Sequence, residues 1–211
     1  MQNRTSNYDI MRSAAAKLFL SYDQGEMIRK LSLVHDDTWL YLPFVGRMYR
    51  IDRKTGSVTW SPDGFQTAFA ADFEAAMTLY DVLCYSKSDC HPAHAFANLN
   101  SFSSLRLGNL PENGFLQGPA ADFTGKALAA ACQALSGKRL DGGDVAYELA
   151  LFPFLSVALR FWEADEEFPS SLQILVDQNV LDFMHYETLM YAMTHLLRRL
   201  REEESAALSP P

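Results

Sequence analysis

Apolar residues near the start of the chain recur at intervals of three and four. The recurring positions are Met11, Ala14, Ala15, Leu18 and Tyr22. This spacing places them on one face of a helix, because an α-helix turns once every 3.6 residues. The pattern therefore predicts a first helix over residues 7–22.

The next stretch changes to short runs rich in β-branched and aromatic residues, separated by turn residues. We expect a β-meander with strands over residues 30–35, 38–45, 47–52 and 57–60. The turn residues 53–56 end in Gly56, and glycine tolerates the positive φ that tight hairpins need.

The rest of the chain mixes both patterns. Helical spacing predicts helices over residues 66–85, 122–135 and 180–201, and apolar runs predict strands over residues 145–152, 155–162 and 172–176. The stretch 90–118 is rich in Ser, Asn, Gly and Pro, so we expect it to be irregular, with one short helix near 93–99. Strands in runs indicate an α+β fold, with antiparallel sheets from the meander and the three C-terminal strands, packed with about four helices.

The length favours a single α+β domain. The chain has 211 residues, and a typical domain holds roughly 100–200. We therefore expect one domain over residues 1–211, with sub-halves 6–90 and 108–201 as the alternative.

The charge balance argues against two classes of partner. Eighteen Lys and Arg face 26 Asp and Glu, a formal net charge of −8, whereas binding to nucleic acids depends on cationic side chains. We expect neither a nucleic acid nor a membrane as partner, since no apolar run is long enough for a membrane helix. The N-terminal residues lack the apolar core of a signal peptide, and three scattered cysteines suggest no disulfide framework. A soluble, acidic, cytoplasmic protein is the expectation.

One segment combines several acids with large apolar residues. Trp162 precedes Asp165, Glu166 and Glu167, and Phe168 follows them. If the aromatic rings cover the carboxylates, at least one of them should hold a proton or bind a cation. Three interpretations stay open: a solvated acidic turn, a metal or ligand site, and a surface that docks a partner protein.

The final predicted helix supplies two further candidates. His185 and Glu187 are two residues apart and point about 200° apart around a helix, so they cannot hold one ion together. Either could meet the acidic segment from elsewhere in the fold. Asp165 and Glu167 would offer oxygen ligands to a divalent cation such as magnesium or manganese, and His185 would then be a candidate base. No other cofactor is evident, because the chain has no phosphate-binding glycine motif.

The C-terminal third resembles a known family. The matching residues are Gly143-Asp144, Leu151-Phe152-Pro153, Trp162, Asp165-Glu166-Glu167-Phe168-Pro169, Ile174-Leu175-Val176-Asp177 and Glu187. Together they resemble domain-of-unknown-function family 3786 over residues 108–200, with a looser match to the N-terminal meander. The family has no assigned activity. The resemblance implies an origin among anaerobic bacteria and archaea, and an accessory role near iron–sulfur or corrinoid chemistry. Any iron–sulfur cluster would belong to a partner, because this chain has no four-cysteine motif.

These observations favour a non-catalytic binding or accessory module for a partner protein or small molecule. The candidate binding residues are Trp162, Asp165, Glu166, Glu167, Phe168, His185 and Glu187. Two alternatives remain: a divalent-metal-dependent hydrolase that uses Asp165 and Glu167, and a structural protomer of a larger assembly.

Overall fold

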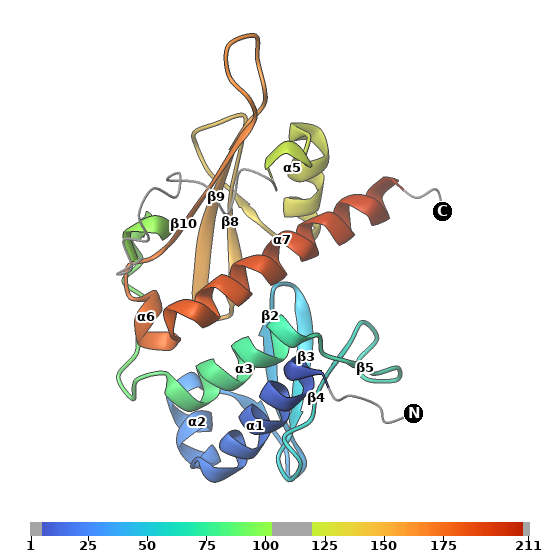
Figure 1. Ribbon diagram of the computed structural model, residues 1–211, viewed down its shortest axis with the longest axis vertical. Coiled ribbons are helices and arrows are strands. Elements are labelled where there is room, and N and C mark those ends of the chain that lie inside the picture. Colours follow the sequence, from blue (N-terminus) through green and yellow to red (C-terminus); the bar gives the residue numbers. More distant parts are fainter. Residues whose placement is uncertain (1–5, 103–119, 209–211) are drawn as a thin grey trace. The chain divides into compact units, whose positions relative to one another are not determined.

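The computed structural model describes residues 6–102 and 120–208, which contain six α-helices and two five-stranded antiparallel sheets (Figure 1). The α+β class with antiparallel sheets is therefore confirmed. The chain forms two compact units. Unit 1 comprises Met1–His91 and Leu181–Met193, and unit 2 comprises Pro92–Val180 and Thr194–Pro211. Each predicted sub-half was one continuous stretch of sequence, whereas unit 1 also includes the later segment Leu181–Met193. The single-domain organisation stays a prediction.

Unit 1 contains the predicted meander and three helices. Its strands are β1 (Val34–His35), β2 (Trp39–Phe44), β3 (Arg47–Asp52), β4 (Val58–Ser61) and β5 (Phe69–Ala70), hydrogen-bonded in that order. Its helices are α1 (Asn7–Ser21), α2 (Gln24–Leu31) and α3 (Phe73–Tyr85). Side chains along β2 alternate between half-buried and buried, because successive residues of a strand face opposite sides of the sheet. Leu40, Leu42 and Phe44 thus enter the core of this unit.

Two predictions in unit 1 are wrong in detail. The strand expected over residues 30–35 is shorter: residues 30–31 end helix α2, and Val34–His35 form β1. Helix α2 begins at Gln24 because the Asp23 side chain accepts hydrogen bonds from the N–H groups of Gly25 and Glu26. The helix expected from residue 66 begins at Phe73. The residues before it form β5, whose Phe69 ring stacks on Trp60 of β4 at 5.1 Å.

Unit 2 contains the predicted C-terminal strands. Its sheet has the order β6-β10-β9-β8-β7, with β6 (Phe96–Asn98), β7 (Lys138–Arg139), β8 (Val145–Phe152), β9 (Leu155–Trp162) and β10 (Ser171–Asp177). Helix α5 (Gly125–Ala134) packs on β8. The three longest strands match the prediction, since each has a long apolar run. Part of the stretch expected to be irregular, residues 103–119, lies outside the described residues.

The short helix expected near residues 93–99 is instead β6, followed by the 3-10 helix η1 (Leu99–Phe102). The Asp177 carboxylate at the end of β10 accepts hydrogen bonds from the N–H groups of Ala93 and His94. These bonds hold the incoming chain beside β10, and β6 then pairs with it antiparallel.

The last predicted helix is interrupted. It comprises α6 (Val180–Phe183) and α7 (Tyr186–Leu208), and α7 is divided between the two units. The break falls at His185, whose N–H donates to Asp81 of α3. At the start of α6 the N–H of Asn179 donates to Asp177, and Asp182 pairs with Lys87. Among the described helices, none combines the length and apolarity needed to cross a membrane.

Candidate functional site

The acidic segment lies in the turn between β9 and β10, which extends past the other strands of its sheet (Figure 1). Residues 163–169, which we call the acidic turn, are all exposed. The Asp165 carboxylate accepts hydrogen bonds from the N–H groups of Phe168 and Glu167 at 2.7 and 2.9 Å. These bonds hold the pKa of Asp165 below its ordinary value. The side chain thus closes its own turn.

Glu163, the first acid of the turn, also has a local partner. Its Oε1 atom accepts a hydrogen bond of 2.7 Å from the N–H of Gly125, the first residue of α5. A carboxylate is stabilising there, because the first N–H groups of a helix lack partners and carry partial positive charge. Glu163 therefore caps a helix.

The aromatic residues do not cover the acids. Trp162 is 38% exposed and Phe168 is 67% exposed, and Glu166 and Glu167 are exposed as well. Within residues 6–102 and 120–208, no three His, Cys, Asp or Glu side chains gather in a group that could hold a metal ion. The binding and metal roles of Trp162, Phe168 and these carboxylates stay predictions.

The structure gives His185 a partner elsewhere, in unit 1. The Nδ1–H of His185 donates to Oδ1 of Asp81 at 2.8 Å, and its backbone N–H donates to Oδ2 at 2.8 Å. The Tyr85 ring lies 4.8 Å from the imidazole in an edge-on arrangement. Glu187 is exposed in the first turn of α7. Among the predicted candidates, His185 contacts Asp81, which lines a cavity.

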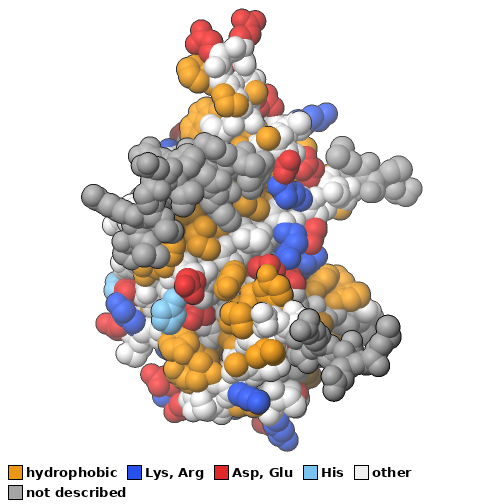
Figure 2. Space-filling model, viewed as in Figure 1, with side chains coloured by type: hydrophobic (Ala, Val, Ile, Leu, Met, Phe, Trp, Pro, Cys, Tyr) orange, Lys and Arg blue, Asp and Glu red, His pale blue; other side chains and the backbone are white. Residues whose placement is uncertain are grey.

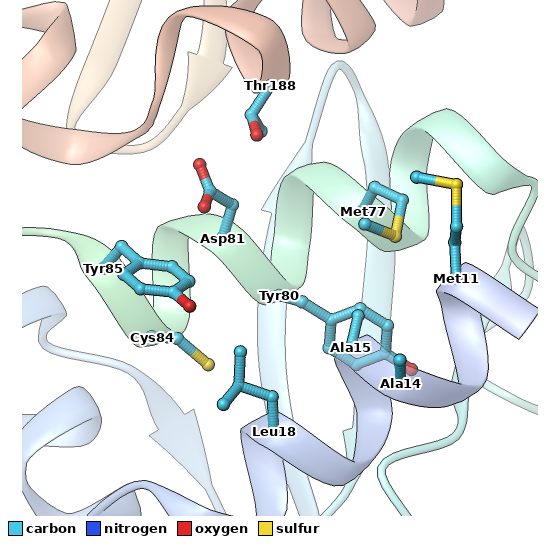
Figure 3. Close-up of a pocket in the computed structure, with 10 residues that line it drawn as sticks. All are labelled: Met11, Ala14, Ala15, Leu18, Met77, Tyr80, Asp81, Cys84, Tyr85 and Thr188. Carbon is cyan, nitrogen blue, oxygen red and sulfur yellow. The ribbon is translucent and has the colours of Figure 1, made fainter.

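That cavity is a cleft of about 360 Å³ between α1 and α3, which we call the α1–α3 cleft (Figure 3). Its lining consists of Met11, Ala14, Ala15, Leu18, Met77, Tyr80, Asp81, Cys84, Tyr85 and Thr188. Four of these lie on the apolar stripe that predicted α1. Of all α1 residues only Phe19 is buried, so most of the stripe faces the cleft and solvent.

The shape of the cleft follows from residue size. Edge-on aromatic pairs join the two helices at both ends, Tyr8 with Phe73 and Tyr22 with Tyr85. Between them α1 presents alanines, which are too small to fill the space the rings hold open. Figure 2 shows apolar side chains gathered over α1 and α3. A contiguous apolar surface of this kind on a folded protein often marks a binding site.

The polar groups of the cleft lie together. Figure 3 shows the Asp81 carboxylate between Tyr85 and Thr188, while Met11 and Met77 face each other at the other end. The Asp81 side chain is 11% exposed. Thr188 is 8% exposed, and among the described residues its hydroxyl has no hydrogen-bond partner. The cleft therefore has an apolar body and one polar end.

Cys84 and Tyr80 of the cleft are neutral near pH 7. Burial raises the pKa of Cys84 to about 12, and burial raises the pKa of Tyr80 to about 12. The Tyr80 hydroxyl donates to the carbonyl oxygen of Gly56 at 2.6 Å. A thiol with so high a pKa is a poor nucleophile, so the lining offers binding surface and no activated nucleophile.

A second hollow, of about 590 Å³, lies in unit 2 beside the β8–β9 hairpin. Its wall includes Lys138, Glu148 and the stacked rings of Phe152 and Phe154. The Glu148 carboxylate accepts a hydrogen bond from Ser156. Its wall thus carries charged groups of both signs.

The sequence reading missed the cleft and Asp81. Asp81 lies in a helix whose apolar stripe was assigned to the core, and an isolated acid there carries no motif. Its partner His185 is 104 positions away. One signal was available: the apolar face of the first helix includes a methionine, a residue that is frequent at adaptable binding surfaces as well as in cores.

A family model described as "Domain of unknown function (DUF3786)" matches residues 23–199. This confirms the resemblance seen in the sequence and extends it over the N-terminal meander. No curated protein and no solved structure matches the chain.

Proposed function

The chain belongs to the DUF3786 family, and because that description assigns no activity, we propose from the geometry that it is a non-catalytic binding module. Its site is the α1–α3 cleft, and its ligand is a small molecule with an apolar body. The observation that carries this proposal is the open apolar stripe of α1, formed by Met11, Ala14, Ala15 and Leu18, facing α3 across the cleft.

Size and lining both support a small molecule. Ligand sites usually enclose roughly 300–1,000 Å³ and combine mainly apolar walls with a few polar groups that orient the ligand. The α1–α3 cleft has about 360 Å³ and matches that description. Met11 and Met77 add adaptability, since methionine side chains are flexible and polarisable.

A matched pair of leucines offers a direct test. Leu18 lines the cleft and Leu20 does not, yet both lie on α1 and both are 39% exposed. We expect the neutral apolar dye Nile red to bind the wild-type protein saturably. Leu18→Gln should weaken binding roughly tenfold, because it removes apolar contact area from the site. Leu20→Gln should change binding by less than about twofold.

The dye is titrated into each variant and its fluorescence is followed. Circular dichroism spectra confirm that both variants fold. Equal weakening by the two substitutions would mean that the dye binds α1 without using the cleft. The absence of saturable binding to the wild-type protein would contradict the proposal itself.

A further inference from the structure

We propose that the ligand of the α1–α3 cleft carries a protonated amine, which binds at the end formed by Asp81, Tyr85 and Thr188. This inference rests on the proposed function and adds the chemical class of the ligand. Three features of the cleft support it: a fixed carboxylate, an aromatic ring beside it, and an unpaired hydroxyl that opens into the cleft.

The carboxylate is held in one orientation. One oxygen of Asp81 accepts from the His185 ring and the other from the His185 backbone N–H, both at 2.8 Å. A carboxylate offers about four acceptor positions, so two remain for a ligand. An ammonium group, which has three N–H donors, can reach these remaining positions. The preformed geometry lowers the entropic cost of binding.

An aromatic residue favours a cation at the same end. Tyr85 follows Asp81 by one helical turn, lines the cleft and lies beside the carboxylate in Figure 3. The faces of aromatic rings attract cations, including the ammonium group of a ligand. A ligand with a carboxylate head would instead meet the negative charge of Asp81.

Thr188 supplies an independent observation. Its side chain lines the cleft and points toward Asp81 in Figure 3. It is more than nine-tenths buried, and the described residues give its hydroxyl no hydrogen-bond partner. The oxygen is not among the enclosed side-chain atoms that lack a partner, so it opens into the cleft. An ammonium group between Thr188 and Asp81 would donate to both.

The protein's own cations do not occupy this position. The ten residues that line the cleft include no Lys or Arg. The ammonium of Lys30 lies near enough to act on Cys84, but it donates to the carbonyl oxygen of Ser86 at 2.8 Å. Among the described contacts, Asp81 is therefore paired with the N–H groups of His185, and no Lys or Arg of the lining lies against its carboxylate.

Ligands that share one apolar body test the head group. Octylamine, octanol and octanoate are titrated at pH 7.5 against the protein carrying bound Nile red, and displacement gives their affinities. We expect octylamine to bind roughly tenfold more tightly than octanol, because its hydrogen bonds to Asp81 are charge-assisted. Octanoate should bind most weakly.

Asp81→Asn should reduce the preference for octylamine over octanol to about twofold or less, since it removes the charge and keeps the shape. Asp165→Asn, which removes the same charge from the acidic turn, should leave the preference intact. Thr188→Val is a second variant, and it should weaken the binding of octylamine more than the binding of octanol. If the Asp81→Asn protein does not fold, the test depends on the Thr188→Val variant and on the preference of the wild-type protein for octylamine over octanol.

The outcomes separate the two proposals. If the dye and all three ligands fail to bind, the proposed function is wrong. If octanol binds as tightly as octylamine, or if octanoate binds most tightly, the cleft remains a binding site and the amine inference is overturned. A preference for octylamine that Asp165→Asn abolishes as strongly as Asp81→Asn would also overturn it, because the preference would then reflect net charge.

Discussion

Asp81 and Asp165 are both aspartates that accept two hydrogen bonds, yet they do different things. Asp165 accepts both from the backbone of its own turn, within three residues. Asp81 accepts both from His185, a residue 104 positions away, and lies at the end of a cavity. The first arrangement shapes a loop in solvent, whereas the second fixes a charge beside an apolar surface.

The comparison shows where conspicuous sequence features mislead. The acids of residues 163–169 attract notice because they are adjacent. Adjacent carboxylates repel one another, and they are usually found where water screens that repulsion. A binding carboxylate must be partly buried and held by neighbours. Those neighbours can come from anywhere in the chain.

The largest expected effect separates the two aspartates by stability. Asp81→Ala should lower the free energy of unfolding by about 1–2 kcal/mol, because it removes two charge-assisted hydrogen bonds at a largely buried side chain. Asp165→Ala should lower it less, since the freed N–H groups of the acidic turn can bond to water. Urea denaturation of the three proteins measures both changes. A larger loss from Asp165→Ala would reverse the comparison.

A middle-sized effect concerns pH and the interior of the cleft. The folded protein raises the pKa of Cys84 above its ordinary value of 9.0, to about 12, so folding favours the neutral thiol. The unfolded chain releases this proton first as pH rises, and the free energy of unfolding should therefore fall between pH 9 and 12.

Cys84→Ala should make this alkaline decline shallower, and urea denaturation at a series of pH values measures it. Cys132, whose pKa burial also raises to about 12, provides the control in unit 2. If the free energy of unfolding of the Cys84→Ala protein falls as steeply with pH as that of the wild type, folding does not raise the pKa of Cys84 as its burial in the lining requires.

The smallest expected effect belongs to the remaining acids of the turn. Glu166→Gln and Glu167→Gln should change the free energy of unfolding by no more than about 0.5 kcal/mol, because substitutions of exposed residues rarely do more. Neither should alter dye binding. A substantial loss of dye binding in either variant would return the candidate site to the acidic turn.

Local patterns were sufficient to predict much of the fold. Strands β2, β3, β8, β9 and β10 have long apolar or alternating runs, and helices α1, α5 and α7 have clear helical periodicity. Family membership was also predicted from residues in the C-terminal third. The origin among anaerobes and the accessory role in iron–sulfur or corrinoid chemistry stay predictions.

The elements that escaped prediction depend on distant contacts. The short strands β5, β6 and β7 exist because longer strands offer them an edge to pair with, and their own sequences carry little signal. Helix α2 is an exception, because its capping side chain, Asp23, directly precedes it. The site escaped for the same reason, since the Asp81–His185 contact joins two separate helices.

Methionine methyl groups allow the most direct test of the α1–α3 cleft. The protein is labelled with ¹³C at its methionine methyls, the signals are assigned with Met→Leu variants, and octylamine is added. Met11 and Met77 line the cleft, whereas Met48 is exposed on β3. The proposal predicts saturable shifts of the Met11 and Met77 signals with little change at Met48. Equal shifts at all three, or none at Met11 and Met77, would contradict it.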